Sequence, residues 1–87
     1  MPDITYGPKF RKSSSKLENK ELERLAGLLK CLAVDTYHPL LHTKHLTGPL
    51  EGLLSFRIGR DYRCIFRILN DKTVFLLEIS HRKNIYN

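Results

Sequence analysis

Hydrophobic and polar residues follow a period of two along the last third of this chain. The pattern runs from Leu54 to Tyr86 and is interrupted twice, at Gly59–Asp61 and at Asn70–Lys72. Alternation of this kind is typical of β-strands, and the interruptions have the composition of turns. Because connections of about three residues join antiparallel neighbours, the three runs predict a β-meander.

A different period, of three and four residues, precedes this region and predicts an amphipathic helix over Lys20–Val34, with Asn19 as its N-cap. Its apolar stripe consists of Leu22, Leu25, Leu28, Leu29, Leu32 and Ala33. The stripe should pack on one face of the meander. The sheet residues expected beneath it are Phe56, Cys64, Phe66 and Leu77, or their neighbours.

The beginning of the chain adds a short β-type run, Asp3–Tyr6, which Gly7 and Pro8 terminate. Pro8 suits the first turn of a helix, which Lys9–Lys12 would continue. The first strand would pair with the meander. We therefore expect an α+β fold in one domain over residues 1–87. A small antiparallel, mixed-edge sheet of about four strands would carry an N-terminal helical hairpin on one face.

Alternation in the middle strand divides its residues between the two faces of the sheet. Tyr62, Cys64, Phe66 and Ile68 share one face, and Arg63, Ile65, Arg67 and Leu69 share the other. The second face is expected to be an open, arginine-bearing platform for a phosphate backbone. The alternative is that these arginines are edge charges that suppress aggregation, which is the preferred reading for Arg60 at the turn.

Charge strengthens the functional interpretation. Fifteen Lys and Arg residues oppose nine Asp and Glu residues, which gives a net charge of +6 and an isoelectric point near 9.6. This balance favours a polyanionic partner, nucleic acid ahead of a membrane, over a merely solvated basic surface. Five of the seven arginines fall between Arg57 and Arg82, and guanidinium groups bind phosphate with paired donors.

Little in the chain suggests a metal, a cofactor or a disulfide framework. Cys31 and Cys64 fit buried apolar positions, and no zinc-type spacing is present. His38, His42 and His45 have helical spacing, but Pro39 interrupts it, so we expect loop histidines and no metal site. No signal peptide or transmembrane run is present, so a reducing cytoplasm is expected.

Several motifs occur together in an order that resembles the RelE/ParE superfamily of toxins from toxin–antitoxin systems. They are Leu46-Thr47-Gly48, Phe56-Arg57-Ile58, Asp61–Phe66 and Ile79–Tyr86. The resemblance covers nearly the whole chain and implies a RelE-like fold. The RelE branch consists of ribosome-dependent messenger-RNA endonucleases, and the ParE branch poisons DNA gyrase. The basic tail resembles the RelE branch.

The resemblance also implies site residues. Catalytic roles would fall to Arg63, His81, Arg82 and Tyr86, and RNA contacts to Arg57, Arg67, Lys44, His45 and Lys83. His81 is the acid or base candidate, and the alternative is a histidine that only bonds the backbone at a strand end. Tyr86 would stack on a base, orient the nucleophile or take part in proton transfer, and the alternative is an anchor that packs the C-terminus on the sheet. Ser55 departs from the family, because a lysine occupies this place in the best-known nuclease. No carboxylate is an obvious general base.

The expected function is that of a toxin which cleaves messenger RNA in the ribosomal A site, without metal or other cofactor, and so inhibits translation. A cognate antitoxin would hold it, across the basic face, with the toxin either a monomer or part of a toxin–antitoxin hetero-oligomer. No membrane partner is expected. The alternatives are a ParE-type gyrase inhibitor and a catalytically weak relic that binds only its antitoxin.

Overall fold

The computed structural model describes residues 3–70 and 72–85. Its elements, including two short 3₁₀ helices, are β1 (Asp3–Tyr6), α1 (Pro8–Ser14), α2 (Asn19–Val34), η1 (Pro39–Leu41), β2 (Lys44–His45), η2 (Gly48–Leu50), β3 (Leu54–Ile58), β4 (Tyr62–Asn70), β5 (Thr73–His81) and α3 (Arg82–Ile85). None of the helices in these two ranges is long and apolar enough to cross a membrane.

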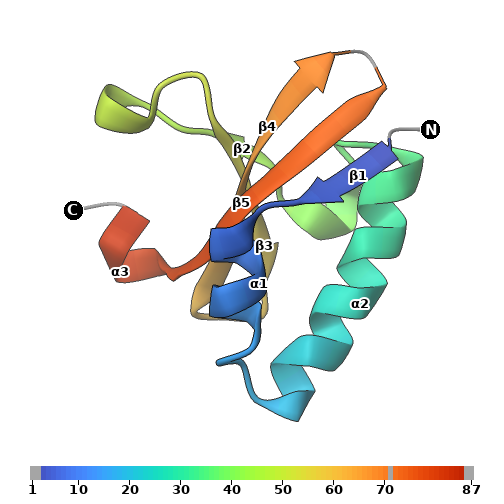
Figure 1. The fold of residues 1–87 in the computed structure, drawn as a ribbon, viewed down its shortest axis with the longest axis vertical. Helices are drawn as coiled ribbons and strands as arrows, with labels where there is room; N and C mark the ends of the chain where they lie inside the picture. The colour runs from blue at the N-terminus through green and yellow to red at the C-terminus, as the bar shows by residue number, and fades with distance from the viewer. Residues whose placement is uncertain (1–2, 71, 86–87) are drawn as a thin grey trace.

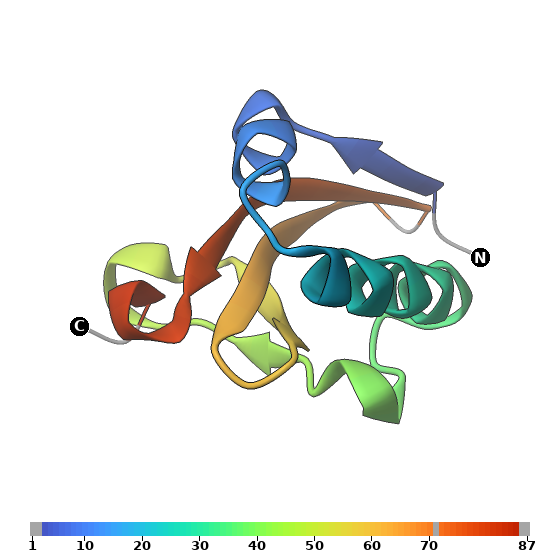
Figure 2. The same ribbon diagram turned by 90° about the horizontal axis from the view of Figure 1, so that it is seen from below.

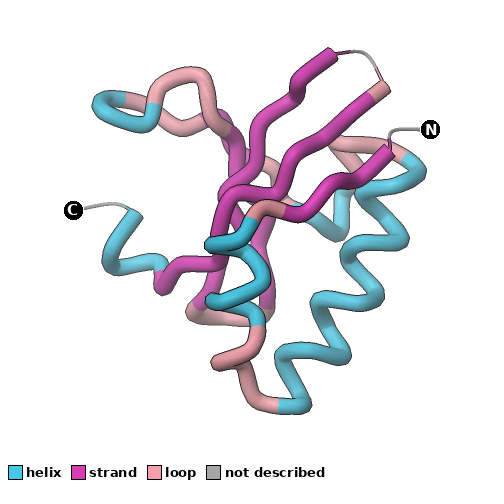
Figure 3. The backbone as a smooth tube through the Cα atoms, viewed as in Figure 1, coloured by secondary structure: helices cyan, strands magenta, loops and turns pink. Residues whose placement is uncertain are grey.

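The strands form one sheet in the order β1-β5-β4-β3-β2 (Figure 1). β3, β4 and β5 make the antiparallel meander that the turn signals predict (Figure 3). β1 pairs in parallel with β5 at one edge, and β2 pairs antiparallel with β3 at the other. The predicted α+β fold with a mixed-edge sheet is therefore confirmed, with five strands where about four were expected.

The helical hairpin and the C-terminal helix lie on different sides of this sheet. α2 lies on one side, and α3 and the segment around η2 lie on the other (Figure 2). α1 packs along β5 and places Phe10 in the core. The predicted N-cap is wrong by one residue, because α2 begins at Asn19 and Glu18 occupies the cap position without a side-chain bond.

The core lies between α2 and the sheet, as the leucine stripe predicts. Leu25 and Leu32 are buried, and the rings of Phe56 and Phe66 beneath them have centroids 5.9 Å apart. Leu22 was expected in the core, but 37% of it is exposed. At 3.6 residues per turn, Leu22 lies roughly 60° away from Leu25 around the axis. It also lies in the first turn of α2, so it flanks the core.

A β-bulge in β5 decides which residues of the last strand face the helix. Ile65 pairs with Glu78 and Phe66 with Leu76, which leaves Leu77 between them without a partner in β4. Leu76 is consequently buried and Leu77 only half-buried, so the expectation that Leu77 joins the core is wrong. The extra residue also returns Ile79 to the core face.

The turn between β3 and β4 lies directly against α2. Gly59 has a left-handed φ of 61°, and a Cβ there would lie 2.6 Å from Arg24 Nη1 and 2.9 Å from Glu21 Oε2. A residue with a side chain would be strained by this backbone conformation, whereas the ends of the Arg24 and Glu21 side chains could shift aside.

Candidate functional site

The sheet face opposite α2 is not the open platform that alternation suggests. Ser55, Arg63 and Ile65 share this face, and their exposed fractions are only 0%, 6% and 5%. The connector between α2 and β3 lies on this side, and the carbonyl oxygen of its His42 contacts Arg63. The reading of Arg63 as an exposed charge is therefore wrong, because the connector covers the centre of the meander. Arg57 remains exposed.

The guanidinium of Arg63 joins the connector to the sheet. Its Nε donates to Ser55 Oγ at 2.7 Å, and its Nη2 donates to the carbonyl oxygens of Ser55 at 3.1 Å and His42 at 2.6 Å. Hydrogen bonds from a charged donor are stronger than neutral ones, and a buried charge needs them to offset its desolvation. Arg63 thus holds residues 42 and 55 together, 13 positions apart in sequence.

Beside Arg63 lies a cleft with a volume of about 240 Å³. It is lined by one histidine, one tyrosine and five cationic side chains: His42, Lys44, Arg57, Arg60, Tyr62, Arg63 and Arg82. Within the described part of the chain, no carboxylate belongs to this lining. A concave surface with several cations and no anion concentrates positive potential, so the cleft is suited to a phosphodiester.

Two of these cations oppose each other directly in the sheet, since Arg57 of β3 pairs with Arg63 of β4. Like charges at such positions destabilise a strand pair. The two side chains turn apart, because Arg57 Nε donates to the Gly59 carbonyl oxygen at 2.8 Å while Arg63 bonds Ser55 and His42. An anion in the cleft would lower the remaining repulsion between the two guanidinium groups.

Arg82 reaches the cleft from the first residue of α3. Its amide donates to the Asp61 carbonyl oxygen at 2.8 Å, which anchors the start of α3 to the β3–β4 turn. Its Nε is 4.0 Å from Asp61 Oδ1, and both side chains are about half exposed, at 53% and 49%. Ion pairs of this kind contribute little because solvent screens them. The guanidinium is therefore well placed to exchange Asp61 for a phosphate.

A second hollow, of about 420 Å³, lies on the other side of Arg57 and His42, which line both spaces. We call it the apolar groove. Its other lining residues come from α2, η1 and the β3–β4 turn: Arg24, Gly27, Leu28, Cys31, Leu40 and Gly59. Leu40 is 62% exposed, so the groove offers apolar surface to a partner. Its cationic rim adjoins the cleft.

A model of the family described as the ParE toxin of type II toxin–antitoxin system, parDE, matches residues 10–86. A candidate toxin of Methanocaldococcus jannaschii, RelE4, is 30% identical over 87 residues, which cover 99% of this chain and 92% of that protein. The chain belongs to the RelE/ParE superfamily of toxins. The resemblance inferred from the motifs is confirmed.

Solved structures of RelE/ParE-type toxins have the same fold. YafQ from E. coli strain BL21(DE3) superposes with a TM-score of 0.79 at 16% identity, and the match covers 100% of both chains. A chain of the toxin–antitoxin complex RelBE2 from Mycobacterium tuberculosis superposes with a TM-score of 0.62 at 28% identity, covering 93% of this chain and 98% of that one.

Of the tail residues expected to be catalytic, one lines the cleft and another does not. Arg82 lines the cleft, whereas His81 is not among its described lining residues. His81 Nδ1 accepts the Lys83 amide at 3.2 Å, so this ring caps α3, and it contacts Tyr62 edge-on with centroids 5.6 Å apart. Lys83 in α3 is likewise outside the described lining. Tyr86 lies outside the described residues.

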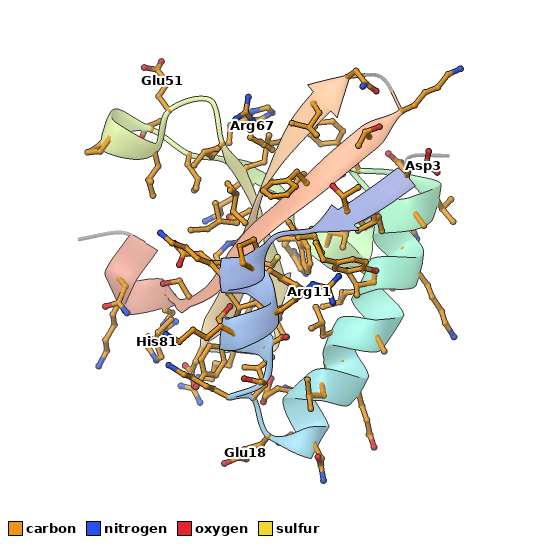
Figure 4. The ribbon with its side chains drawn as sticks, viewed as in Figure 1. Asp3, Arg11, Glu18, Glu51, Arg67 and His81 are labelled. Atoms are coloured by element: carbon orange, nitrogen blue, oxygen red, sulfur yellow. The ribbon has the colours of Figure 1, made fainter. Side chains whose placement is uncertain are left out.

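Of the five residues expected to contact RNA, Lys44 and Arg57 line the cleft, whereas Lys83, His45 and Arg67 do not. The ring of His45 stacks on Tyr37, whose hydroxyl lies 3.0 Å from His45 Nε2, and it is absent from the lining. Arg67 is exposed near the far end of β4, well away from His81 (Figure 4). The structure thus brings Lys44, Arg57, Arg63 and Arg82 together.

Three lining residues carried no predicted role in the site: His42, Arg60 and Tyr62. Tyr62 precedes Arg63 in β4 and pairs with His81, which directly precedes Arg82. Arg60 belongs to the same turn as Asp61, which anchors α3, and its assignment as an edge charge is incomplete. His42 could not be located from the sequence, since its position depends on the path of the connector.

The cysteines and histidines of this toxin do not form a second chemical site. Cys64 is fully buried, as expected, and burial raises the pKa of its thiol, so it stays protonated. Cys31 is half-buried at the apolar groove, more accessible than expected. Across residues 3–70 and 72–85, no three His, Cys, Asp or Glu side chains gather as metal ligands would.

Proposed function

We propose that this toxin is a ribosome-dependent endoribonuclease that cleaves messenger RNA in the ribosomal A site and thereby stops translation. The observation that carries the proposal is the cleft, in which five cations surround a space of about 240 Å³. Its donor chemistry suits a phosphate, since carboxylates, the ligands that Mg²⁺ favours, are absent from the described lining. Protein cations would therefore supply the positive charge.

Cleavage would use the 2′-hydroxyl of the RNA as an internal nucleophile. Negative charge then grows on the phosphate oxygens, where preorganised guanidinium groups stabilise it. Arg82 and Arg57, which are exposed at the cleft, would bind these oxygens, and the buried Arg63 would hold the wall against which the phosphate rests. A proton acceptor for the 2′-hydroxyl is also required, and the family resemblance makes His81 a candidate for either the acid or the base.

A cognate antitoxin would neutralise the toxin by covering the same surface. The M. tuberculosis relative is itself part of a toxin–antitoxin complex. In this chain, the net charge of +6 and the cationic rim shared by cleft and groove favour an antitoxin segment with acidic and apolar residues. Its apolar side chains would enter the groove while its carboxylates oppose Arg57. The toxin would thus be a monomer when free and part of a hetero-oligomer when neutralised.

Induction of the toxin in cells should cut translated transcripts and spare untranslated ones. A reporter message with its start codon removed serves as the matched control, because it has the same sequence but recruits no elongating ribosome. Primer extension on both messages should reveal cuts in the translated one alone. The matching family model is named for ParE, which favours gyrase as the second candidate target. Intact translated message with gyrase-linked double-strand DNA breaks would establish that alternative.

A further inference from the structure

His42 lies where the cleft and the apolar groove meet. It lines both the cleft and the apolar groove, and it is exposed. In the described lining of the cleft it is the only histidine, and no carboxylate accompanies it. Histidine is the side chain that most readily exchanges protons near neutral pH, whereas tyrosine, arginine and lysine hold theirs. The group best able to accept a proton within the cleft is therefore His42.

The backbone of His42 is held in a conformation that few residues adopt. Its φ and ψ are both 49°, and it is the one non-glycine residue with positive φ in the described ranges. Such left-handed conformations are strained for a residue with a side chain and persist only where the surroundings enforce them. The enforcing contact is visible: the carbonyl oxygen of His42 accepts from Arg63 Nη2 at 2.6 Å. Arg63 thus positions His42 at the cleft.

The other histidines of the chain have ring partners elsewhere. His38 Nδ1 accepts the Leu40 amide at 3.2 Å, and His45 bonds the hydroxyl of Tyr37. His81 caps α3 through the Lys83 amide. A ring nitrogen that accepts a backbone amide must be unprotonated, so protonation at Nδ1 of His38 or His81 would break these bonds. None of these three histidines is among the described residues of the cleft.

We propose that His42, and not His81, takes the proton from the 2′-hydroxyl, with Arg63 as its positioning residue. This assignment rests on the proposed nuclease function. The 2′-oxygen forms a bond to phosphorus and the P–O5′ bond breaks. The 2′-hydroxyl proton passes to a neutral ring nitrogen of His42, and the leaving 5′-oxygen takes a proton from water. The hydroxide left by that water takes the proton back from the His42 imidazolium, which restores the neutral ring. The products are a 2′,3′-cyclic phosphate and a 5′-hydroxyl.

The test uses purified toxin, purified ribosomes programmed with a short message, and single-turnover conditions. His42→Asn removes the imidazole but suits a left-handed backbone, because asparagine tolerates positive φ. It should cut roughly 10²–10⁴-fold more slowly than wild type. His38→Asn is the matched control, since an asparagine oxygen can also accept the Leu40 amide, and it should cut like wild type. His81→Asn should lose far less than His42→Asn.

Rescue of cleavage by added imidazole would distinguish a catalytic role of His42 from a purely structural one. His42→Gly keeps the left-handed backbone and vacates the space of the ring, so added imidazole should restore cleavage in proportion to its concentration, without a change in melting temperature. Suppose that wild type cuts the message but His42→Asn cuts at the same rate, or imidazole fails to rescue His42→Gly. Either result would overturn the role of His42 and leave the nuclease function standing. Failure of wild type to cut would overturn both.

Discussion

Replacement of Arg63 by alanine should lower the free energy of unfolding by about 2–5 kcal/mol, the largest loss expected from any single cationic residue of the toxin. The substitution would leave Ser55 Oγ and two carbonyl oxygens without their donor, and a buried unsatisfied polar group costs roughly 1–3 kcal/mol. The connector would also lose its contact with β4. Toxicity should disappear, because the cleft loses one wall and His42 loses its restraint.

Chemical denaturation of three variants measures this effect. Arg67→Ala is the control, since Arg67 lies on the same strand but is exposed, and surface substitutions usually stay within about 0.5 kcal/mol of wild type. Arg63→Lys should fall between the two, because an ammonium group cannot reproduce the planar fork that bonds Ser55 and His42. If Arg63→Ala unfolds at the same denaturant concentration as wild type, Arg63 is not the tie between connector and sheet.

Replacement of Arg82 by alanine should abolish toxicity but, unlike replacement of Arg63, should leave the stability of the fold unchanged. Its side chain is 53% exposed, so little packing is removed, whereas its anchoring bond to Asp61 uses the backbone amide and survives. Loss of one preorganised donor to a developing oxyanion costs about 2.7–4 kcal/mol, or 10²–10³-fold in rate. Growth arrest on induction should therefore vanish at unchanged protein levels.

Growth curves and thermal melting of Arg82→Ala should be compared with those of Lys30→Ala. Lys30 carries the same charge and is exposed, but it belongs to α2 and to neither hollow. Equal losses of toxicity in both variants would mean that net charge matters and the cleft does not. If Arg82→Ala remained fully toxic, the assignment of Arg82 to the functional site would be wrong.

The meander and the helix could be predicted because local signals specify them. Gly59 and Asn70 mark the two turns, and the spacing from Leu25 to Leu32 marks the buried helix face. These signals depend only on neighbours along the chain. The short pairing of Lys44 with Ser55 was missed, since it depends on where the connector meets β3.

The bulge at Leu77 lies beyond sequence reasoning because a distant residue supports it. The amide of Ile79 donates to Ser13 Oγ at 2.9 Å, so α1 satisfies a backbone group past the end of β1. Strict alternation along β5 therefore fails at one position, and with it the prediction for Leu77.

The chemistry of the site was harder to predict than its charge. The gathering of Arg57 and Arg82 follows from the hairpins, because both lie near the end of the sheet that the β3–β4 turn closes. The burial of Arg63 does not, since it requires the carbonyl oxygen of His42, 21 residues away in sequence. The likeness to a family identified four of the five cationic residues of the cleft, all except Arg60, and only the fold placed His42 beside them.

The ends of the cut message test most directly whether the cleft cleaves RNA through the 2′-hydroxyl. Purified toxin is added to translating ribosomes, and the downstream fragments are ligated to an adaptor with and without prior phosphorylation by a kinase. Attack by the 2′-hydroxyl leaves a 5′-hydroxyl, so ligation should succeed only after the kinase step, and the upstream fragment should end in a cyclic phosphate. Fragments that ligate without the kinase, or a message that remains intact, would contradict this mechanism.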